Sequence, residues 1–338
     1  MRTNYHINRY RKKNSKAIRR VALGNTKTKN ISKSTFIVII VVLIAFLIFF
    51  FLNDRFFKID GIPTWDDLYK KTGLSSSVTA VEGDVTVHYI DVGQGDCELI
   101  RTQSKAVLID SGEKEYYADV IEYIKSQNIE YIDYVIVTHP HSDHAGGMSF
   151  ILDEFDIGTV IMPEIQDSVV PTTSTYIRLL NSIDNKGINL DNAKAGNEYI
   201  LDDVKMTLLS PVQDYNDLNN YSVVVKLVHG ENSFLFTGDI ENEAETDILE
   251  KGYDVSADVL KVAHHGSSTS SQKSFINAVS PQYAVIEVGS PNNYNHPNEE
   301  TVKRLENKKI SIYRTDLYGN IVFVSDGSTL EIITEKEP

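Results

Sequence analysis

The sequence predicts an α/β protein in which two β-sheets pack face to face with helices outside them, an αββα sandwich, preceded by one transmembrane helix. Residues 36–52 form an unbroken apolar run. Beyond it, short segments typical of paired strands are followed by strand–helix units. This order of hairpins and then strand–helix units occurs twice, and two sheets covered by helices would satisfy it.

The first 53 residues are basic and end in the apolar run. They hold eleven Lys or Arg residues and no Asp or Glu. We predict a basic cytoplasmic tail over 1–33 and a transmembrane helix over 34–53, whose apolar centre would span about 25 Å. Residues 53–57 lack the small-residue cleavage site of a signal peptide. Because basic flanks stay in the cytoplasm, we expect a single-pass protein of the cell membrane with an extracellular domain.

Residues 54–83 contain Gly, Pro and a Ser run, so we interpret them as a juxtamembrane linker. The remaining residues, 84–338, are predicted to form one hydrolase domain. Apolar and β-branched residues between polar turns predict strands at 85–90, 98–101, 106–109, 134–137, 202–209, 223–228, 234–236, 259–262, 284–288, 310–313, 321–324 and 330–333. Helical spacing predicts helices at 116–126, 176–186, 241–250, 272–279 and 298–307, and a helix followed by a strand within 150–162.

Charge is distributed unevenly along the chain. The formal net charge of −14 combines the basic tail with a remainder that holds 22 of the 33 basic residues and all 47 acidic ones, a net of −25. Such a domain is not suited to a broad electrostatic grip on nucleic acid, so a polyanion would have to be held locally by metals and a few side chains. The single cysteine, Cys97, excludes an intramolecular disulfide.

Three imidazoles and a carboxylate follow the predicted strand 134–137, in the sequence Thr-His-Pro-His-Ser-Asp-His. His139 and His141 can point the same way from an extended segment, whereas Asp143 and His144 lie on a turn entering a helix. Imidazole and carboxylate are ligands that Zn²⁺, Mn²⁺ and Fe²⁺ accept. This spacing favours two adjacent metals, placed at a sheet rim where ligands bind in α/β folds.

Other polar residues end the strands farther along the chain. Asp239 could bridge two metals or simply begin a helix. The pair His264 and His265, followed by Ser267, could supply a further ligand and a neighbour that transfers a proton or contacts an anion. His296 could be a ligand, a general acid, a substrate contact or an ordinary loop residue.

The segment Asp-Val-Gly-Gln-Gly-Asp at 91–96 joins the first two predicted strands. Its glycines are typical of a tight turn, but its polar residues Asp91, Gln94 and Asp96 exceed what a turn needs and could face the site. Asp110 ends the third strand, where it could orient a metal-bound histidine.

Together the motifs His-x-His-x-Asp-His, Thr-Gly-Asp and His-His-Gly-Ser resemble the metallo-β-lactamase superfamily. With the 91–96 segment and Asn-His-Pro at 295–297, residues 83–334 look similar to the hydrolase domain of the ComEC/Rec2 competence proteins and their stand-alone relatives. The resemblance implies the αββα fold and a binuclear Zn²⁺ or Mn²⁺ site. It assigns His139 and His141 to one metal, Asp143 and His144 to the other, Asp239 between them, and a ligand from His264 or His265.

The sequence departs from this pattern at one ligand. Many superfamily members carry a further His before the bridging Asp, whereas residues 219–222 here are Asn-Asn-Tyr-Ser. The first metal would then keep an open position or take a weaker donor such as Asn220. The multi-helix channel of ComEC is also absent from this sequence, so DNA transport is not supported.

We therefore expect an extracellular, membrane-anchored phosphodiesterase or nuclease, in which hydroxide generated between the two metals attacks phosphorus. Asp143 would accept a proton, and His264, His265 or His296 would protonate the leaving oxygen. The substrate would be DNA or a cell-wall polymer, and no protein partner is predicted. The alternatives are a teichoic acid or phosphocholine esterase, a lactone or β-lactam hydrolase, and a non-catalytic scaffold with a degenerate site.

Overall fold

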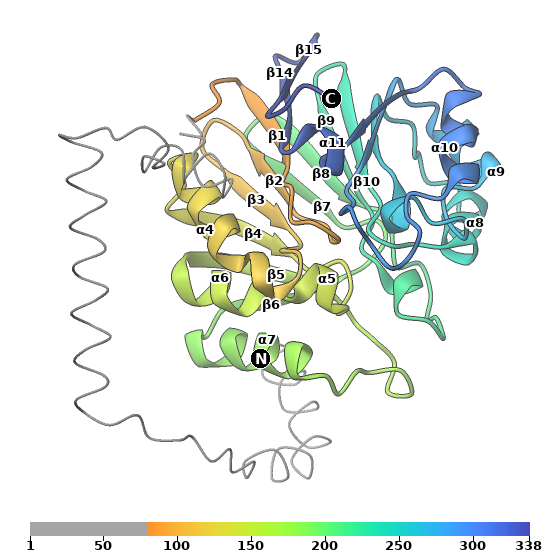
Figure 1. The fold of residues 1–338 in the computed structure, drawn as a ribbon. Coiled ribbons are helices and arrows are strands. Elements are labelled where there is room, and N and C mark those ends of the chain that lie inside the picture. The colour runs from red at the N-terminus through yellow and green to blue at the C-terminus, as the bar shows by residue number, and fades with distance from the viewer. Residues whose placement is uncertain (1–79) are drawn as a thin grey trace, which may run out of the picture. The chain divides into compact units, whose positions relative to one another are not determined.

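The structure is a computed structural model that describes residues 80–338 (Figure 1). The predicted tail, the predicted transmembrane helix and most of the predicted linker lie outside the described residues. Within residues 80–338, no helix is long and apolar enough to cross a membrane.

The first sheet has eight strands and contains the strand that precedes the His-rich loop. Its order is β15 (Leu330–Thr334), β14 (Ile321–Ser325), β1 (Val85–Tyr89), β2 (Glu98–Arg101), β3 (Ala106–Ile109), β4 (Tyr131–Ile136), β5 (Asp156–Pro163) and β6 (Asn189–Ala193). Strands β3 to β6 pair in parallel, and the others pair antiparallel. The sequence did not predict β6, because its residues Asn-Leu-Asp-Asn-Ala are mostly polar.

The second sheet has seven strands. Its order is β13 (Ser311–Arg314), β12 (Tyr283–Ile286), β11 (Val259–Lys261), β10 (Asn232–Phe236), β9 (Val225–His229), β8 (Val204–Leu208) and β7 (Glu198–Leu201). Strands β10 to β13 pair in parallel, whereas β7 to β10 form antiparallel hairpins.

Helices cover the outer faces of the two sheets, as the αββα prediction requires. Figure 1 shows α4 (Tyr117–Ser126), α6 (Met148–Glu154) and α7 (Ser174–Lys186) beside the first sheet, and α8 (Asn242–Glu250), α9 (Lys273–Val279) and α10 (Glu299–Glu306) beside the second. The short helices α5 (Ser142–Ala145) and α11 (Thr315–Tyr318), and 3₁₀ turns at Lys114–Tyr116, Asn219–Tyr221 and Ala263–Gly266, lie in the connections. The two-sheet α/β fold is therefore confirmed.

A continuous apolar core lies between the sheets. It takes Val87 and Tyr89 from β1, Phe236 from β10 and Phe323 from β14. The Tyr89 ring stacks on Phe236 at 5.9 Å and meets the edge of Phe323 at 6.0 Å. Each such buried aromatic side chain stabilises the fold by about 2–3 kcal/mol relative to an exposed one, so the core fixes how the two sheets meet.

The chemistry-bearing loops lie where strands end. The His-rich loop follows β4, the Thr-Gly-Asp segment follows β10, the His pair follows β11, and the loop that contains His296 follows β12. Parallel strands present their carboxyl ends at one sheet edge, so two sheets packed face to face bring these four loops together.

Candidate functional site

The Asp110 side chain fixes the start of the His-rich loop. Its Oδ1 accepts a hydrogen bond from the Thr138 backbone N–H at 2.8 Å, and its Oδ2 accepts one from the Thr138 hydroxyl at 2.6 Å. Oδ2 also lies 2.7 Å from Nδ1 of His144, on α5. This buried carboxylate therefore ties the end of β4 to the following helix, in the orienting position that the sequence suggested.

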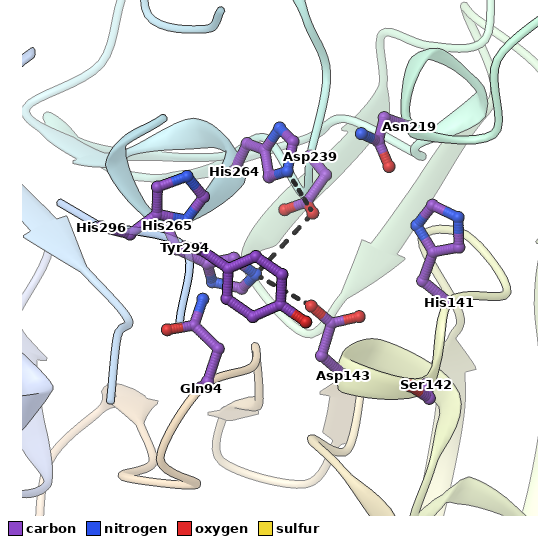
Figure 2. Close-up of a pocket in the computed structure, with 10 residues that line it drawn as sticks. All are labelled: Gln94, His141, Ser142, Asp143, Asn219, Asp239, His264, His265, Tyr294 and His296. Carbon is purple, nitrogen blue, oxygen red and sulfur yellow. Dashed lines mark ion pairs between the residues drawn. The ribbon is translucent and has the colours of Figure 1, made fainter. Parts of the chain in front are cut away.

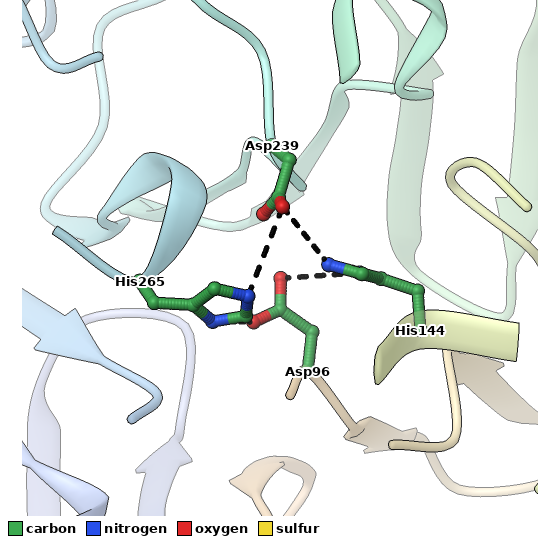
Figure 3. A group of neighbouring side chains, drawn as sticks. All are labelled: Asp96, His144, Asp239 and His265. Carbon is green, nitrogen blue, oxygen red and sulfur yellow. Dashed lines mark ion pairs between the residues drawn. The ribbon is translucent and has the colours of Figure 1, made fainter. Parts of the chain in front are cut away.

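The carboxylate of Asp239 is the centre of the site. Its Oδ2 faces the Nε2 atoms of four imidazoles, at 3.2 Å for His144, 3.7 Å for His264, 3.7 Å for His265 and 3.9 Å for His139. Figure 3 shows Asp239, His144 and His265 converging with Asp96. Each of the four residues offers one ligand atom, a ring nitrogen or a carboxylate oxygen, and these atoms lie within 4.8 Å of one another. Residues from four separate loops therefore meet around one oxygen atom.

Hydrogen bonds on the far side of each ring leave Nε2 free to act as an acceptor. The His144 Nδ1 donates to the Asp110 carboxylate, which accepts only. The His265 Nδ1 donates to the Glu287 backbone carbonyl at 2.9 Å. The His139 Nδ1 lies 3.1 Å from the Thr138 hydroxyl oxygen. In their neutral forms, the three rings thus present an Nε2 lone pair to the site, as metal-binding histidines do.

His141 and Asp143 add two possible metal ligands to the cluster, one beside His139 and one beside His265. The His141 Nδ1 lies 2.9 Å from the His139 Nε2, and the Asp143 Oδ2 lies 3.4 Å from the His265 Nε2. Burial would raise the pKa of Asp143, but its close contact with the His265 ring and the charge of His144 hold that pKa well below the usual range. Asp143 is consequently ionised at neutral pH.

The donors fit divalent cations. The buried atoms His144 Nε2, His265 Nε2 and Asp239 Oδ1 have no hydrogen-bond partner among the described residues. Unpaired buried polar atoms are costly, so several that converge are typical of a site that binds cations. Imidazole nitrogen and carboxylate oxygen are the donors of Zn²⁺ and Mn²⁺ sites.

The electrostatics of the site also favour positive charge. Burial would lower the pKa of His265, but Asp239 and Asp96 raise it to about 10. The same balance, with Asp239 as the largest charge, raises the pKa of His144 well above its usual value. The buried carboxylates stabilise the protonated forms of these two rings. A metal ion that binds the rings would displace those protons and take over the positive charge.

An unusual backbone separates the two adjacent histidines. His264 and His265 both have positive φ, 53° and 52°, a conformation that costs non-glycine residues about 1–3 kcal/mol each. As a result His265 is buried and points into the cluster, whereas His264 is 22 % exposed, with its Nδ1 3.3 Å from the Glu241 carboxylate. The pair therefore occupies two different environments, one deep and one at the surface.

Two glycines permit the loops to approach this closely. A Cβ on Gly95 would lie 2.4 Å from the Asp143 carbonyl oxygen, and one on Gly238, whose φ is +49°, would lie 2.9 Å from the Ser222 Cβ. Any larger residue at Gly95 would push the 91–96 loop away from α5.

An open pocket of about 310 Å³ leads from the surface to the cluster. Figure 2 shows the side chains that line it: Gln94, His141, Ser142, Asp143, Asn219, Asp239, His264, His265, Tyr294 and His296. Of the polar residues suggested in the 91–96 segment, Gln94 lines the pocket and Asp96 lies in the buried cluster.

Three residues suggested from the sequence lie elsewhere. The Asn220 Oδ1 accepts hydrogen bonds from the backbone N–H groups of Glu241 and Ala244, so it caps α8 and does not face the cluster as a weak donor. Asp91 faces Lys336 at 3.5 Å, and the Ser267 hydroxyl pairs with Thr269. None of the three suggested residues lines the pocket.

A buried charged network under the cluster was not foreseen. Lys261, on β11, is fully buried and its ammonium group contacts the Asp96 carboxylate. Asp96, Glu98 and Glu287 bring carboxyl oxygens within 4.8 Å of one another. Burial and then Asp96 raise the pKa of Glu287 to about 8. Charged residues inside otherwise apolar strands were the available sequence signal. Tyr294 was also missed, because nothing local distinguishes it from other loop residues.

Comparison with known proteins gives consistent matches. Residues 90–289 match the family model described as the metallo-beta-lactamase superfamily. The chain is 30 % identical to ComE operon protein 3 of Bacillus subtilis over 261 residues, which cover 72 % of this chain and 33 % of that protein. It is 29 % identical to competence protein ComA of Neisseria gonorrhoeae, over 78 % of this chain and 36 % of that protein. It is 28 % identical to recombination protein 2 of Haemophilus influenzae, over 70 % of this chain and 28 % of that protein. The chain thus spans about a third of the length of these relatives.

Proposed function

Because the chain belongs to the metallo-β-lactamase superfamily of metal-dependent hydrolases, we propose that it hydrolyses phosphodiesters, with single-stranded DNA as the favoured substrate. The observation that carries the proposal is the Asp239 carboxylate, which has four imidazole Nε2 atoms within 3.9 Å of one oxygen. A carboxylate so placed can bridge two cations, and paired cations suit in-line displacement at phosphorus. The names of two relatives, a competence protein and a recombination protein, favour DNA.

In this proposal His139, His141 and Asp239 would hold one Zn²⁺ or Mn²⁺ ion, and Asp143, His144, His265 and Asp239 would hold a second. The bound ions would supply positive charge for the phosphoryl oxygens and would acidify a water molecule. Asp110 and the Glu287 carbonyl hold the His144 and His265 rings in their binding orientation.

His264 is our proposed proton donor to the leaving oxygen. It lines the pocket, its Nε2 lies 3.7 Å from Asp239, and its Nδ1 lies 3.3 Å from the Glu241 carboxylate, a contact that can orient the ring. His296 is less suitable because burial, together with the charges of His265 and His264, lowers its pKa to about 4. His296 is then neutral near pH 7 and serves as a substrate contact. Asp143, partly exposed and ionised, accepts a proton from the attacking water.

The alternatives differ in what they require of the site. A teichoic acid or phosphocholine ester is also a phosphodiester, so it would use the same residues and is distinguished only by substrate. A lactone or β-lactam hydrolase would break a carbon–oxygen or carbon–nitrogen bond at the same centre. A non-catalytic scaffold would have no reason to keep the unpaired donors around Asp239.

We also propose that the domain is held outside the cell by the apolar segment at 34–53. The basic residues before that segment and the acidic balance after it support this orientation. Proteolysis of intact cells, with antibodies against each end of the chain, tests the topology. Protection of the domain until the cells are lysed would contradict it.

The activity is tested with bis-p-nitrophenyl phosphate and a single-stranded oligodeoxynucleotide in the presence of Mn²⁺ or Zn²⁺. We expect Asp143→Ala to lower turnover at least 100-fold, and the exposed Asp153→Ala on α6 to match wild type. Chelation by EDTA should abolish turnover, and added metal should restore it. If nitrocefin or a lactone is cleaved and no phosphodiester is, the proposal is wrong. Equal rates in wild type and Asp143→Ala would reveal a contaminating enzyme.

A further inference from the structure

We propose that Tyr294 forms a subsite that stacks a nucleobase next to the scissile phosphodiester. The inference rests on the proposed phosphodiesterase function and adds to it a residue that selects nucleic acid over other phosphodiesters.

The Tyr294 side chain is exposed at the place where substrate must enter. It is 65 % exposed, and the other large apolar side chains of the described residues that are similarly exposed do not line the pocket. Figure 2 shows its ring among the side chains that line the pocket. A large exposed aromatic surface at a site is typical of a ligand contact.

The Tyr294 ring is held in place before any ligand arrives. One face stacks on His296, with ring centroids 5.8 Å apart and planes inclined by 25°. The Asn292 side chain clamps the loop: its Oδ1 accepts from the backbone N–H groups of Tyr294 and His296, and its Nδ2 donates to the carbonyls of Gly289 and His296. A ring ordered in advance loses little entropy when a base stacks on it.

A row of rings connects Tyr294 to the reaction centre. The His296 ring lies 6.2 Å from His265 and 5.5 Å from His264, so Tyr294 is one ring farther out than His296. A phosphate at the cluster would therefore leave an attached nucleoside near Tyr294.

The charges around the pocket make stacking the main available source of binding energy outside the metals. None of the described residues that line the pocket is Lys or Arg, so no fixed cation there attracts the sugar-phosphate backbone. A second pocket of about 450 Å³ is lined by Glu241, which lies 3.3 Å from the His264 Nδ1, and by Glu243, and these carboxylates would repel phosphates. A polynucleotide is therefore directed across the Tyr294 side, where every base offers a face to the ring.

The first measurement is hydrolysis of two 12-mers by the full-length protein with Mn²⁺, one of thymidylate and one with abasic residues throughout. Wild type should cleave the thymidylate 12-mer faster. We expect Tyr294→Ala to lower kcat/KM for it about tenfold, within the range measured for loss of a base–aromatic stack, and to leave the abasic 12-mer unchanged. Tyr294→Phe should retain wild-type preference, because it keeps the ring and removes only the hydroxyl. Tyr131→Ala, an exposed tyrosine outside the pocket, is the matched control.

The second measurement does not depend on turnover. Calorimetric titration of the Mn²⁺-loaded protein compares thymidine 5′-monophosphate with methyl phosphate, which lacks the base. We expect the nucleotide to bind more tightly in wild type and in Tyr294→Phe, and the difference to vanish in Tyr294→Ala.

The two measurements separate failure of the subsite from failure of the proposed function. If neither 12-mer is cleaved but the nucleotide binds more tightly through Tyr294, the phosphodiesterase proposal fails on DNA and the subsite stands. Equal loss of activity on both 12-mers in Tyr294→Ala, a loss in Tyr294→Phe as large as in Tyr294→Ala, or equal binding of both phosphates by wild type overturns the subsite.

Discussion

Lys261 provides a direct test of how the site is supported, because its ammonium group is fully buried against the Asp96 carboxylate. Burial would raise the pKa of Asp96, but Lys261, followed by His144 and His265, lowers it to about 2. A Lys261→Met variant keeps an unbranched side chain of similar length and removes only the charge. Asp96 would then be a buried carboxylate without its main partner.

The expected cost follows from that loss. Removing one partner of a buried ion pair typically destabilises a protein by about 3–5 kcal/mol, because the remaining charge stays out of water. This is a large part of the roughly 5–15 kcal/mol that stabilises a domain. Two further buried carboxyl groups, on Glu98 and Glu287, lie close to Asp96 and add no positive charge, so loss of the ammonium group leaves only the His144 and His265 rings to offset the Asp96 charge.

Lys226 supplies a matched control on the same sheet. Its ammonium group donates to Asp254 at 2.6 Å, but the Asp254 side chain is 74 % exposed. Water can solvate that carboxylate after Lys226→Met, so the variant should lose only about 0–1 kcal/mol of ion-pair energy.

The assay is equilibrium unfolding in urea at pH 7. The slope of the unfolding free energy against urea concentration is compared among variants, because an unchanged slope shows that the variants differ in stability alone. We expect Lys261→Met to be destabilised by several kcal/mol more than Lys226→Met. Adding Asp96→Asn to Lys261→Met should recover part of the loss, since no unpaired charge then remains. Equal destabilisation by the two lysine variants, or simple additivity in the double variant, would refute the reasoning.

Three further outcomes follow from the contacts of other histidines and of Asp110. Burial, and secondly the charge of Arg101, lower the pKa of His88 from 6.5 to about 3; its stabilising contribution is complete above pH 6.5 and is lost as pH falls toward 3. Between pH 6.5 and 5 the unfolding free energy of wild type should fall about 2 kcal/mol more than that of His88→Gln, measured by urea titration at each pH, and parallel pH profiles would contradict this. The His265→Ala variant should bind one metal ion fewer per chain by elemental analysis, whereas His264→Ala should keep both ions and lose turnover; an equal loss of metal from both would show that the roles are wrongly divided. Asp110→Asn weakens the acceptor that orients a ligand, so metal affinity by calorimetry should drop about 10- to 100-fold, and unchanged affinity would show that this carboxylate does not set the ring.

The order of elements and the residues at strand ends could be predicted because both are local features of the sequence. The pattern of β4, β10 and β11 followed by polar motifs is visible without knowing how the strands pair. Strand β6 could not be predicted in this way, because a polar segment becomes a strand only by pairing with β5. The fold thus follows largely from periodicity, whereas a strand such as β6 depends on tertiary pairing.

The same distinction separates the site residues. His139, His141, Asp143 and His144 stand together in the sequence, so their convergence is readable. Whether Asn220 faces a metal or caps a helix depends on where α8 begins relative to its side chain, which only the packed structure decides. A sequence motif can therefore identify a metal site without showing which of the other polar residues belong to that site.

The buried network links the stability of the fold to the affinity of the site for cations. Lys261 ends β11, and His264 and His265 follow on the same segment three and four residues later. Asp96 contacts the ammonium group with one oxygen and faces the His265 Nδ1 at 3.2 Å with the other. The carboxylate that anchors the strand end thus also lies behind a proposed metal-binding ring. A bound cation and the lysine ammonium group then offset the same buried negative charge, so a substitution that changes one of these interactions must change the other.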